Sequence, residues 1–196
     1  MGTPVQIPQD IGIYEPPVAT GALRQGEVLS QVVQVKLQSA EEENRPTVEL
    51  VEHPFAVIVS QDCDLYWDFK ARQENRQFSL PSVLFCEVVT AEELRGTPEI
   101  KSDIWKRIRQ NQDERYQFLQ AVPAEKDAQG LGLPELGLDF KRYFTIPTEE
   151  VYRQLGASAK RRCRLVTPYA EHLSNRFFQF QSRVALPAEH FSAPVA

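Results

Sequence analysis

The sequence feature that most constrains the fold is an apolar run at residues 55–59 that ends abruptly in polar residues. A short apolar run bounded in this way is typical of a strand that is buried on both faces. Side chains at the end of a buried strand can be held rigidly, as a functional site requires. The polar cluster at this end consists of Ser60, Gln61, Asp62, Cys63 and Asp64. We therefore expect a central strand whose end carries a candidate binding site.

Other strands are predicted on both sides of this run. Apolar and polar residues alternate at 28–37 and at 47–51, which predicts half-buried strands, and a nearly continuous apolar run covers 82–89. Because Pro54 cannot donate a hydrogen bond to a sheet, we expect it to begin the central strand and to separate it from 47–51. Short strands at this spacing favour a small β-barrel.

The remaining elements are predicted from helix-capping residues and from apolar spacing. Thr90 and Glu93 have the spacing of a capping box at the start of a short helical turn. The other predicted elements are, in order, a loop or helical turn at 68–76, a helix from Ser102 or Asp103 to about residue 121, a loop at 130–140, a strand at 143–146, a short helix from Pro147 to Gly156, a strand at 163–167 and a last helix that begins at Pro168.

These elements predict an α+β protein with a β-barrel-like front lobe and an appended C-terminal lobe of helices and strands. The predicted divisions are an extended N-terminal segment at 1–22, the barrel-like lobe at 23–97, an α+β lobe at 98–186 that ends in an amphipathic helix, and a tail at 187–196. We expect the chain to form one compact domain, since 196 residues lie within the range of a single domain.

The net charge of −5 hides an uneven distribution along the chain. Residues 1–140 carry 13 Lys and Arg against 23 Asp and Glu, whereas residues 141–183 carry nine basic and three acidic side chains. The basic excess includes three candidate binding residues, Arg161, Arg162 and Arg164. Two interpretations stay open: these arginines contact phosphates while nearby tyrosines stack on bases, or they pair inside the protein with the acidic front lobe.

Two aspartates make the polar cluster a candidate metal site. In a strand, Asp62 and Asp64 would face the same side, and Glu87 on a neighbouring strand would add a third carboxylate for a divalent cation. The alternative is that the two aspartates cap the following turn and that Cys63 is a small buried side chain. The first interpretation predicts a metal-dependent phosphodiesterase, and the second predicts a structural role.

Several other chemistries find no support in the sequence. It has no His-x-x-x-His or Cys-x-x-Cys pair, no glycine-rich phosphate loop and no Gly-x-Ser-x-Gly motif, so we expect no cofactor. The N-terminal residues lack the pattern of a secretory signal, and no apolar run reaches the length of a membrane helix. Three widely spaced cysteines favour reduced thiols, so we expect a cytoplasmic protein without membrane contact.

The front of the chain has a glycine-acidic-aliphatic opening at Gly26 and Glu27, a proline, Pro54, that leads into a valine-rich strand ending in Ser60, and a later strand that ends in Thr90. Over roughly residues 22–95 this pattern resembles that of the MazF/PemK-type toxins. Proteins of that family are SH3-like barrels that cleave single-stranded RNA without a metal ion. The resemblance therefore implies an SH3-like barrel, with His53 as acid or base and Thr90 as a phosphate contact. His53 replaces an arginine of the family's pattern, and the carboxylates of the polar cluster would repel an RNA backbone.

From these features we expect a non-catalytic interaction or regulatory module of the bacterial cytoplasm that binds a protein partner. Nucleic acid is the alternative partner, through the basic C-terminal lobe. Two enzymatic functions stay open beside this one: a toxin-like, metal-independent endoribonuclease that uses His53 and Thr90, and the metal-dependent phosphodiesterase. The uneven charge is the observation on which the interaction hypothesis depends.

Overall fold

The structure, a computed structural model, describes residues 12–39, 46–77 and 80–183. Within these ranges the chain has an α+β fold, and no helix is long and apolar enough to cross a membrane. The strands are β1 (Tyr14–Glu15), β2 (Glu27–Ser39), β3 (Pro46–Ile58), β4 (Ser82–Thr90), β5 (Tyr116–Leu119), β6 (Leu136–Pro147) and β7 (Lys160–Leu165). The helices are α1 (Asp62–Gln73), α2 (Ala91–Arg95), α3 (Ser102–Arg109), α4 (Thr148–Leu155), α5 (Tyr169–Gln181) and a short 3-10 helix (Ala124–Lys126).

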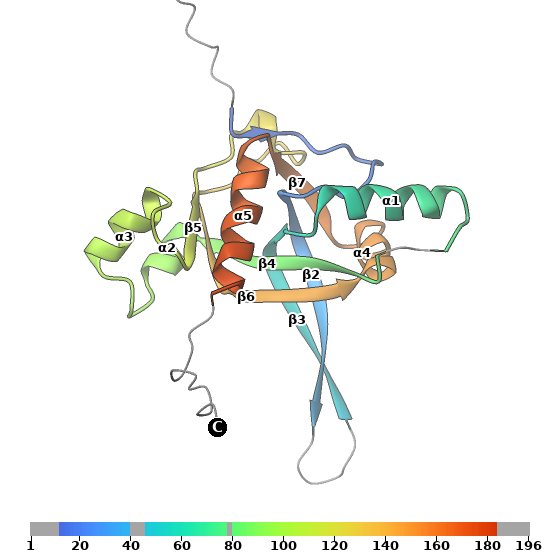
Figure 1. The fold of residues 1–196 in the computed structure, drawn as a ribbon, viewed down its shortest axis with the longest axis horizontal. Coiled ribbons are helices and arrows are strands. Elements are labelled where there is room, and N and C mark those ends of the chain that lie inside the picture. Colours follow the sequence, from blue (N-terminus) through green and yellow to red (C-terminus); the bar gives the residue numbers. More distant parts are fainter. Residues whose placement is uncertain (1–11, 40–45, 78–79, 184–196) are drawn as a thin grey trace, which may run out of the picture.

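All of these strands belong to one antiparallel sheet, in the order β1-β7-β2-β3-β4-β6-β5. The sheet is not closed into a barrel. Its centre is formed by β2, β3 and β4, and β7 and β6 from the second half of the chain flank them (Figure 1). The two halves of the chain therefore build one sheet. The predicted tail at 187–196, and residues 1–11 of the predicted extended segment, lie outside the described residues.

The central strand is buried on both faces, as the sequence predicted. Val57 of β3 belongs to an apolar cluster that includes Leu173 of α5. The next residue, Ile58, belongs to a second cluster that includes Leu65 of α1 and Val151 of α4. Because successive side chains of a strand point to opposite faces, α5 covers one face of the sheet and α1 and α4 cover the other.

A third cluster joins α2 and α3 to the edge strand β5 (Figure 1). It includes Leu94, Ile108 and Tyr116, all of which are buried. Gly137 of β6 lies directly beneath α2, where a Cβ atom would overlap the side chain of Leu94. Glycine at this position therefore allows the helix to lie close against the sheet.

The long helix predicted from Ser102 or Asp103 to about residue 121 is wrong. Instead, α3 ends at Arg109, and Tyr116–Leu119 form β5. Asn111 adopts a left-handed conformation with a φ of 53°, and its side-chain amide exchanges hydrogen bonds with the backbone N–H and C=O of Phe118. This bridge ends the helix and turns the chain, so the apolar residues that follow meet the sheet instead of a helix face.

Other predicted boundaries are partly correct. The capping box of Thr90 and Glu93 is present at the start of α2, α4 lies between Pro147 and Gly156, and α5 follows Pro168. However, α1 begins at Asp62, inside the polar cluster, and β6 begins at Leu136, inside the predicted loop.

The strand predicted at 47–51 and the central strand are one continuous β3. Pro54 lies within it, between the pairs Val32–His53 and Ser30–Phe55, and Gln31, the β2 residue between these pairs, has a φ of 58°. Pairing of β3 with β4 begins only at Phe55, so Pro54 lies where the part of β3 with a strand on both sides ends.

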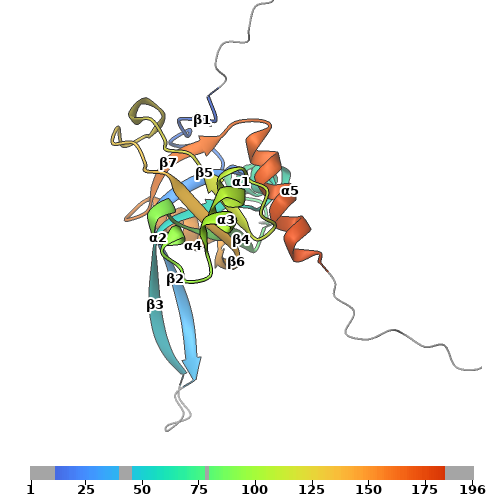
Figure 2. The same cartoon turned by 90° about the vertical axis from the view of Figure 1, so that its left-hand side faces the viewer.

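Beyond this point β2 and β3 form a two-stranded arm, which we define as residues 33–39 and 46–52. Pairing of β2 with β7 ends at Ser30, and no other strand of the described chain pairs with the arm. The arm projects from the body of the molecule in both views (Figures 1 and 2). Gln154 of α4 holds its base, because its side-chain amide accepts a hydrogen bond of 2.9 Å from the Val33 N–H and donates one of 2.8 Å to the Val33 carbonyl.

Candidate functional site

Two residues of the predicted polar cluster are engaged in contacts between neighbouring segments. Ser60 is buried, and its Oγ accepts a hydrogen bond of 2.8 Å from the backbone N–H of Leu84 on β4. Asp62 accepts hydrogen bonds of 2.6 to 3.0 Å from the Arg24 guanidinium and one of 2.7 Å from the Gln25 N–H. Burial opposes ionisation of Asp62, but these bonds outweigh it and lower the pKa of the carboxyl group.

The other members of the cluster lie on the surface at the start of α1. Gln61 is the N-cap residue, and Cys63 is exposed, unlike the buried side chain that the structural interpretation expected. Asp62 and Asp64 lie in the first turn of the helix, where carboxylates interact favourably with the helix dipole. Residues two apart on a helix do not face the same side, so the shared face expected for a strand is not formed.

The structure does not bring the three predicted metal ligands together. Whereas Asp62 pairs with Arg24, Glu87 faces two other residues. Its Oε1 lies 3.8 Å from His53 Nδ1, and its Oε2 lies 3.2 Å from Arg142 Nε. His53 and Arg142 lower the pKa of Glu87. In the part of the chain that the structure describes, no group of three or more His, Cys, Asp or Glu residues is arranged to hold a metal ion.

The two residues predicted for ribonuclease chemistry also make internal contacts. His53 is 5% exposed, and its ring stacks on Phe144 with the ring centroids 3.9 Å apart. The imidazole Nε2 lies 3.3 Å from Gln34 Oε1. The Thr90 hydroxyl accepts a hydrogen bond from the Glu93 N–H and donates one to the Glu93 carboxylate. An acid or base must reach the proton that it transfers, and a ligand cannot readily reach the enclosed His53 ring in this arrangement.

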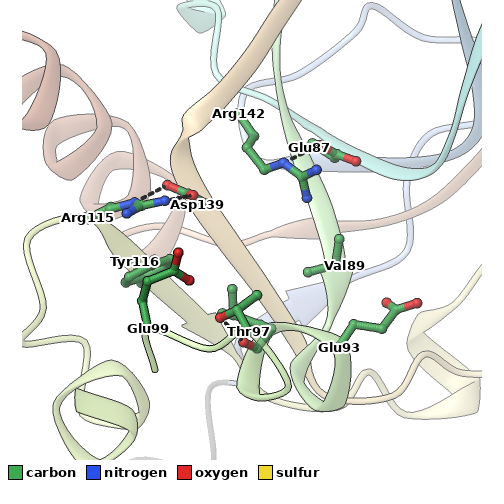
Figure 3. A pocket seen from close by; sticks show the side chains of 10 residues that line it. Glu87, Val89, Glu93, Thr97, Glu99, Arg115, Tyr116, Asp139 and Arg142 are labelled. Carbon is green, nitrogen blue, oxygen red and sulfur yellow. Dashed lines mark hydrogen bonds and ion pairs between the residues drawn. The ribbon is translucent and has the colours of Figure 1, made fainter. Parts of the chain in front are cut away.

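A surface cavity of about 270 Å³ lies beside Glu87 (Figure 3). A shift in the β4–β6 register produces a bulge here, and Asp139 and Arg142 from this part of β6 line the cavity. Arg115 binds Asp139 through hydrogen bonds of 2.8 and 2.5 Å, and Arg142 pairs with Glu87 across the cavity lining (Figure 3). Because both arginines are already paired with carboxylates, the cavity does not favour an anionic ligand.

The basic run at 160–164 contributes to ion pairs within the protein. Arg162 binds Asp127 through two hydrogen bonds of 2.8 and 2.7 Å, and Arg164 pairs with Glu15 at 2.8 Å. Arg161 donates to three backbone carbonyls of the segment that precedes β2. The side chains of Arg161, Arg162 and Arg164 are 9%, 10% and 21% exposed. These contacts favour the interpretation in which the basic residues pair inside the protein.

One carboxylate of this network is almost completely buried. Glu27 is 1% exposed, and its Oε1 lies 3.2 Å from Arg161 Nη1 without accepting a hydrogen bond from any described residue. Its Oε2 accepts a hydrogen bond of 3.1 Å from the Arg24 N–H. Burial raises the pKa of Glu27 to about 7, and the positive charge of Arg161 opposes this shift only in part. The ionisation of Glu27 therefore changes near neutral pH.

An aliphatic face is exposed on the arm. Val35 lies directly opposite Leu50, and Leu37 lies directly opposite Val48, so these four side chains share one face of the ribbon. They are 55%, 68%, 74% and 62% exposed, respectively. We call this group the aliphatic face. The reverse side of the ribbon is mainly polar and carries Gln34, Lys36, Gln38, Thr47 and Glu49. Contiguous apolar surface of this kind is typical of an interaction site, which makes this face the candidate functional site.

The sequence-based predictions did not identify the aliphatic face as a functional site. Alternation at 28–37 and 47–51 predicted strands with one buried face, but no helix or strand within the described ranges covers this part of the ribbon. The sequence did contain a signal for this face: apolar and polar residues alternate at 28–37 and again at 47–51, on the two sides of one short charged connection. Such a pattern predicts a hairpin whose apolar residues share a face.

Comparison of the chain with models of known protein families gave no match, and comparison with curated proteins gave none either. The resemblance of residues 22–95 to the MazF/PemK-type toxins therefore stays a prediction.

Proposed function

We propose that this protein is a non-catalytic interaction module that binds another protein through the aliphatic face of the arm. The observation that supports the proposal is the grouping of four aliphatic side chains, each more than half exposed, on one face of a projecting ribbon. Removing apolar surface from water contributes about 25 cal/mol per Å². The complex with a partner that covers this face is therefore stabilised by the hydrophobic effect.

The anchoring of the arm also supports this function. Its two strands continue into the centre of the sheet, and Gln154 of α4 fixes its base at Val33. A binding surface on a supported element is more precisely positioned than one on a loop, and less conformational entropy is lost when the partner binds.

The contacts of the other candidate residues favour this function over the two enzymatic ones. An endoribonuclease would use His53 and Thr90, which stack on an aromatic ring and cap a helix, respectively. A phosphodiesterase would use Asp62 and Glu87, which are paired with basic residues at separate places. Intact single-stranded RNA after incubation with excess protein in EDTA would argue further against the endoribonuclease.

A regulatory role in the bacterial cytoplasm and a relationship to SH3-like barrels are parts of this proposal. The support for a barrel relationship is the antiparallel β2-β3-β4 arrangement, which begins at Gly26 and Glu27 of the resemblance. Gly26 has a φ of 76° and lies against Leu165 and Ala170, so local packing also accounts for glycine at this position.

Affinity capture from the native host at low salt tests the proposed function. The wild-type protein is compared with a face variant, Leu37→Ser with Leu50→Ser, and with a control variant, Lys36→Ser with Glu49→Ser. The control residues lie directly opposite each other on the reverse side of the same ribbon. Mass spectrometry identifies the captured protein, and the ratio of absorbance at 260 and 280 nm measures bound nucleic acid.

The cells are treated with a chemical crosslinker before capture, so that a weak contact is retained. The proposal predicts a protein that is captured by the wild type and the control but is lost from the face variant. Thermal melting of all three proteins checks that the body of the fold is intact. Equal capture by the three proteins, or nucleic acid that elutes at high salt in place of a protein, would contradict the proposed function.

A further inference from the structure

We infer that the partner that covers the aliphatic face is the same face of a second copy of this chain. This inference rests on the proposed function, which assigns the face to protein binding and leaves the partner open. The arrangement of the large and small side chains on the face identifies the partner.

Leucine and valine alternate on the face in both directions. Along β2, Val35 is followed by Leu37, and the residues opposite them on β3 are Leu50 and Val48. The two leucines therefore occupy one diagonal of a square of four side chains, and the two valines occupy the other. Directly opposite residues have Cβ atoms about 5 Å apart, so the four side chains form one continuous patch.

This alternation makes the patch complementary to itself. When two such ribbons pack face to face, their two-fold axis lies in the plane of contact, either along the arm or across it. An axis along the arm places Val35 against Leu50 of the second copy. An axis across the arm places Val35 against Leu37 of the second copy. In both arrangements each leucine meets a valine, and pairing of large with small side chains allows two layers to interdigitate.

Charge distinguishes the two arrangements. Glu52 is exposed and lies on the same side of the ribbon as the aliphatic face, directly opposite Val33. An axis along the arm would bring the Glu52 carboxylates of the two copies to the same end, whereas an axis across the arm places them at opposite ends. The projection of the arm also allows the two bodies to lie at opposite ends of the contact (Figures 1 and 2). The geometry therefore points to a dimer whose arms run in opposite directions.

The size of the face sets the strength of this contact. Four aliphatic side chains at these exposures present on the order of 400 Å², about half of the ~800 Å² that each partner buries in a standard interface. Standard interfaces have dissociation constants from picomolar to micromolar, so we expect a weaker value here, on the order of 100 µM. The protein should therefore be monomeric when dilute and dimeric when concentrated.

Sedimentation equilibrium of the full chain, from about 10 µM to 1 mM, tests the inference. The average mass of the wild type should rise from one chain towards two over this range. The face variant Leu37→Ser with Leu50→Ser should raise the dissociation constant at least tenfold, since it removes the larger apolar side chains from both sides of the contact. The control Lys36→Ser with Glu49→Ser should dimerise like the wild type.

Two exchanges that conserve composition test the complementarity itself. Val35→Leu with Leu50→Val places both leucines on β2, so an axis across the arm brings leucine against leucine and should weaken the dimer severalfold. Val35→Leu with Leu37→Val places the leucines opposite each other, and the same axis still brings leucine against valine, so this dimer should persist. The reverse outcome would show arms that run in the same direction and would overturn the proposed arrangement.

A wild type that remains monomeric at 1 mM would overturn the inference, and so would a dimer that survives the serine substitutions. These outcomes are separate from failure of the proposed function. If the wild type is monomeric but captures a different protein through the aliphatic face, only the second copy is ruled out as the partner. If capture is the same for all three proteins and no dimer forms, both proposals fail.

Discussion

Substitution of the buried Glu27 by glutamine is expected to change the pH dependence of stability. Glu27 is 1% exposed and has a pKa of about 7, whereas a glutamate in the unfolded chain has a pKa near 4.5. Between these two pH values the folded protein binds a proton that the unfolded chain has already released. Stability therefore falls as pH rises through this window.

The two pKa values give the size of the effect. Below about pH 4.5 the carboxyl group is protonated in both states, so its ionisation does not affect the free energy of unfolding. Above about pH 7 the group is ionised in both states, and the full destabilisation of the folded state is present. A difference of about 2.5 pH units corresponds to about 3 kcal/mol. Glu27→Gln has no group to ionise at this position. The free energy of unfolding of the wild type minus that of the variant should therefore decrease by about 3 kcal/mol between pH 4.5 and pH 8.

Urea unfolding of both proteins at several pH values between 4.5 and 8 measures this difference. Titration of all other groups contributes to both proteins and cancels in the subtraction, provided that the variant keeps the fold. A difference that stays constant across the window would refute the reasoning. A difference that increases with pH would show that the pair with Arg161 lowers the pKa of Glu27 instead.

Two further predictions concern contacts that position the candidate surfaces. Gln154→Ala removes both hydrogen bonds to the Val33 backbone at the base of the arm. It should lower the free energy of unfolding, measured in urea, by about 1 to 3 kcal/mol and should accelerate amide exchange at Val33. Unchanged exchange at Val33 would contradict the anchoring role. Asp127→Asn leaves the buried Arg162 guanidinium without its counter-charge. It should therefore lower the free energy of unfolding by about 3 kcal/mol or more. A loss below about 1 kcal/mol would indicate that Arg162 is solvated instead.

The sequence predicted those parts of the fold that depend on local chemistry. Thr90 and Glu93 form a capping box because both members lie within four residues, and Pro147 and Gly156 bound α4 for similar local reasons. The helix predicted to residue 121 failed because Asn111 bonds to Phe118 on a strand, and helical spacing does not report such a contact.

The candidate site was less predictable, because it depends on which partners the fold supplies. The charges of Arg161 and Arg162 are visible in the sequence, but their carboxylate partners are Glu27 and Asp127, which are distant in the chain. Alternation in β2 and β3 predicted one apolar face correctly. The absence of a covering element along the described arm depends on where β4 and β7 end, and alternation within a single strand does not determine this.

Hydrogen–deuterium exchange tests most directly whether the aliphatic face of the arm is the contact surface. Exchange of the dilute protein is compared with that of the protein in the complex, at the concentration at which sedimentation shows the contact to be formed. We predict slower exchange at residues 33–38 and 47–52 in the complex and unchanged exchange at 160–165. Protection that falls on 160–165 or on the start of α1, with the arm unchanged, would contradict the account.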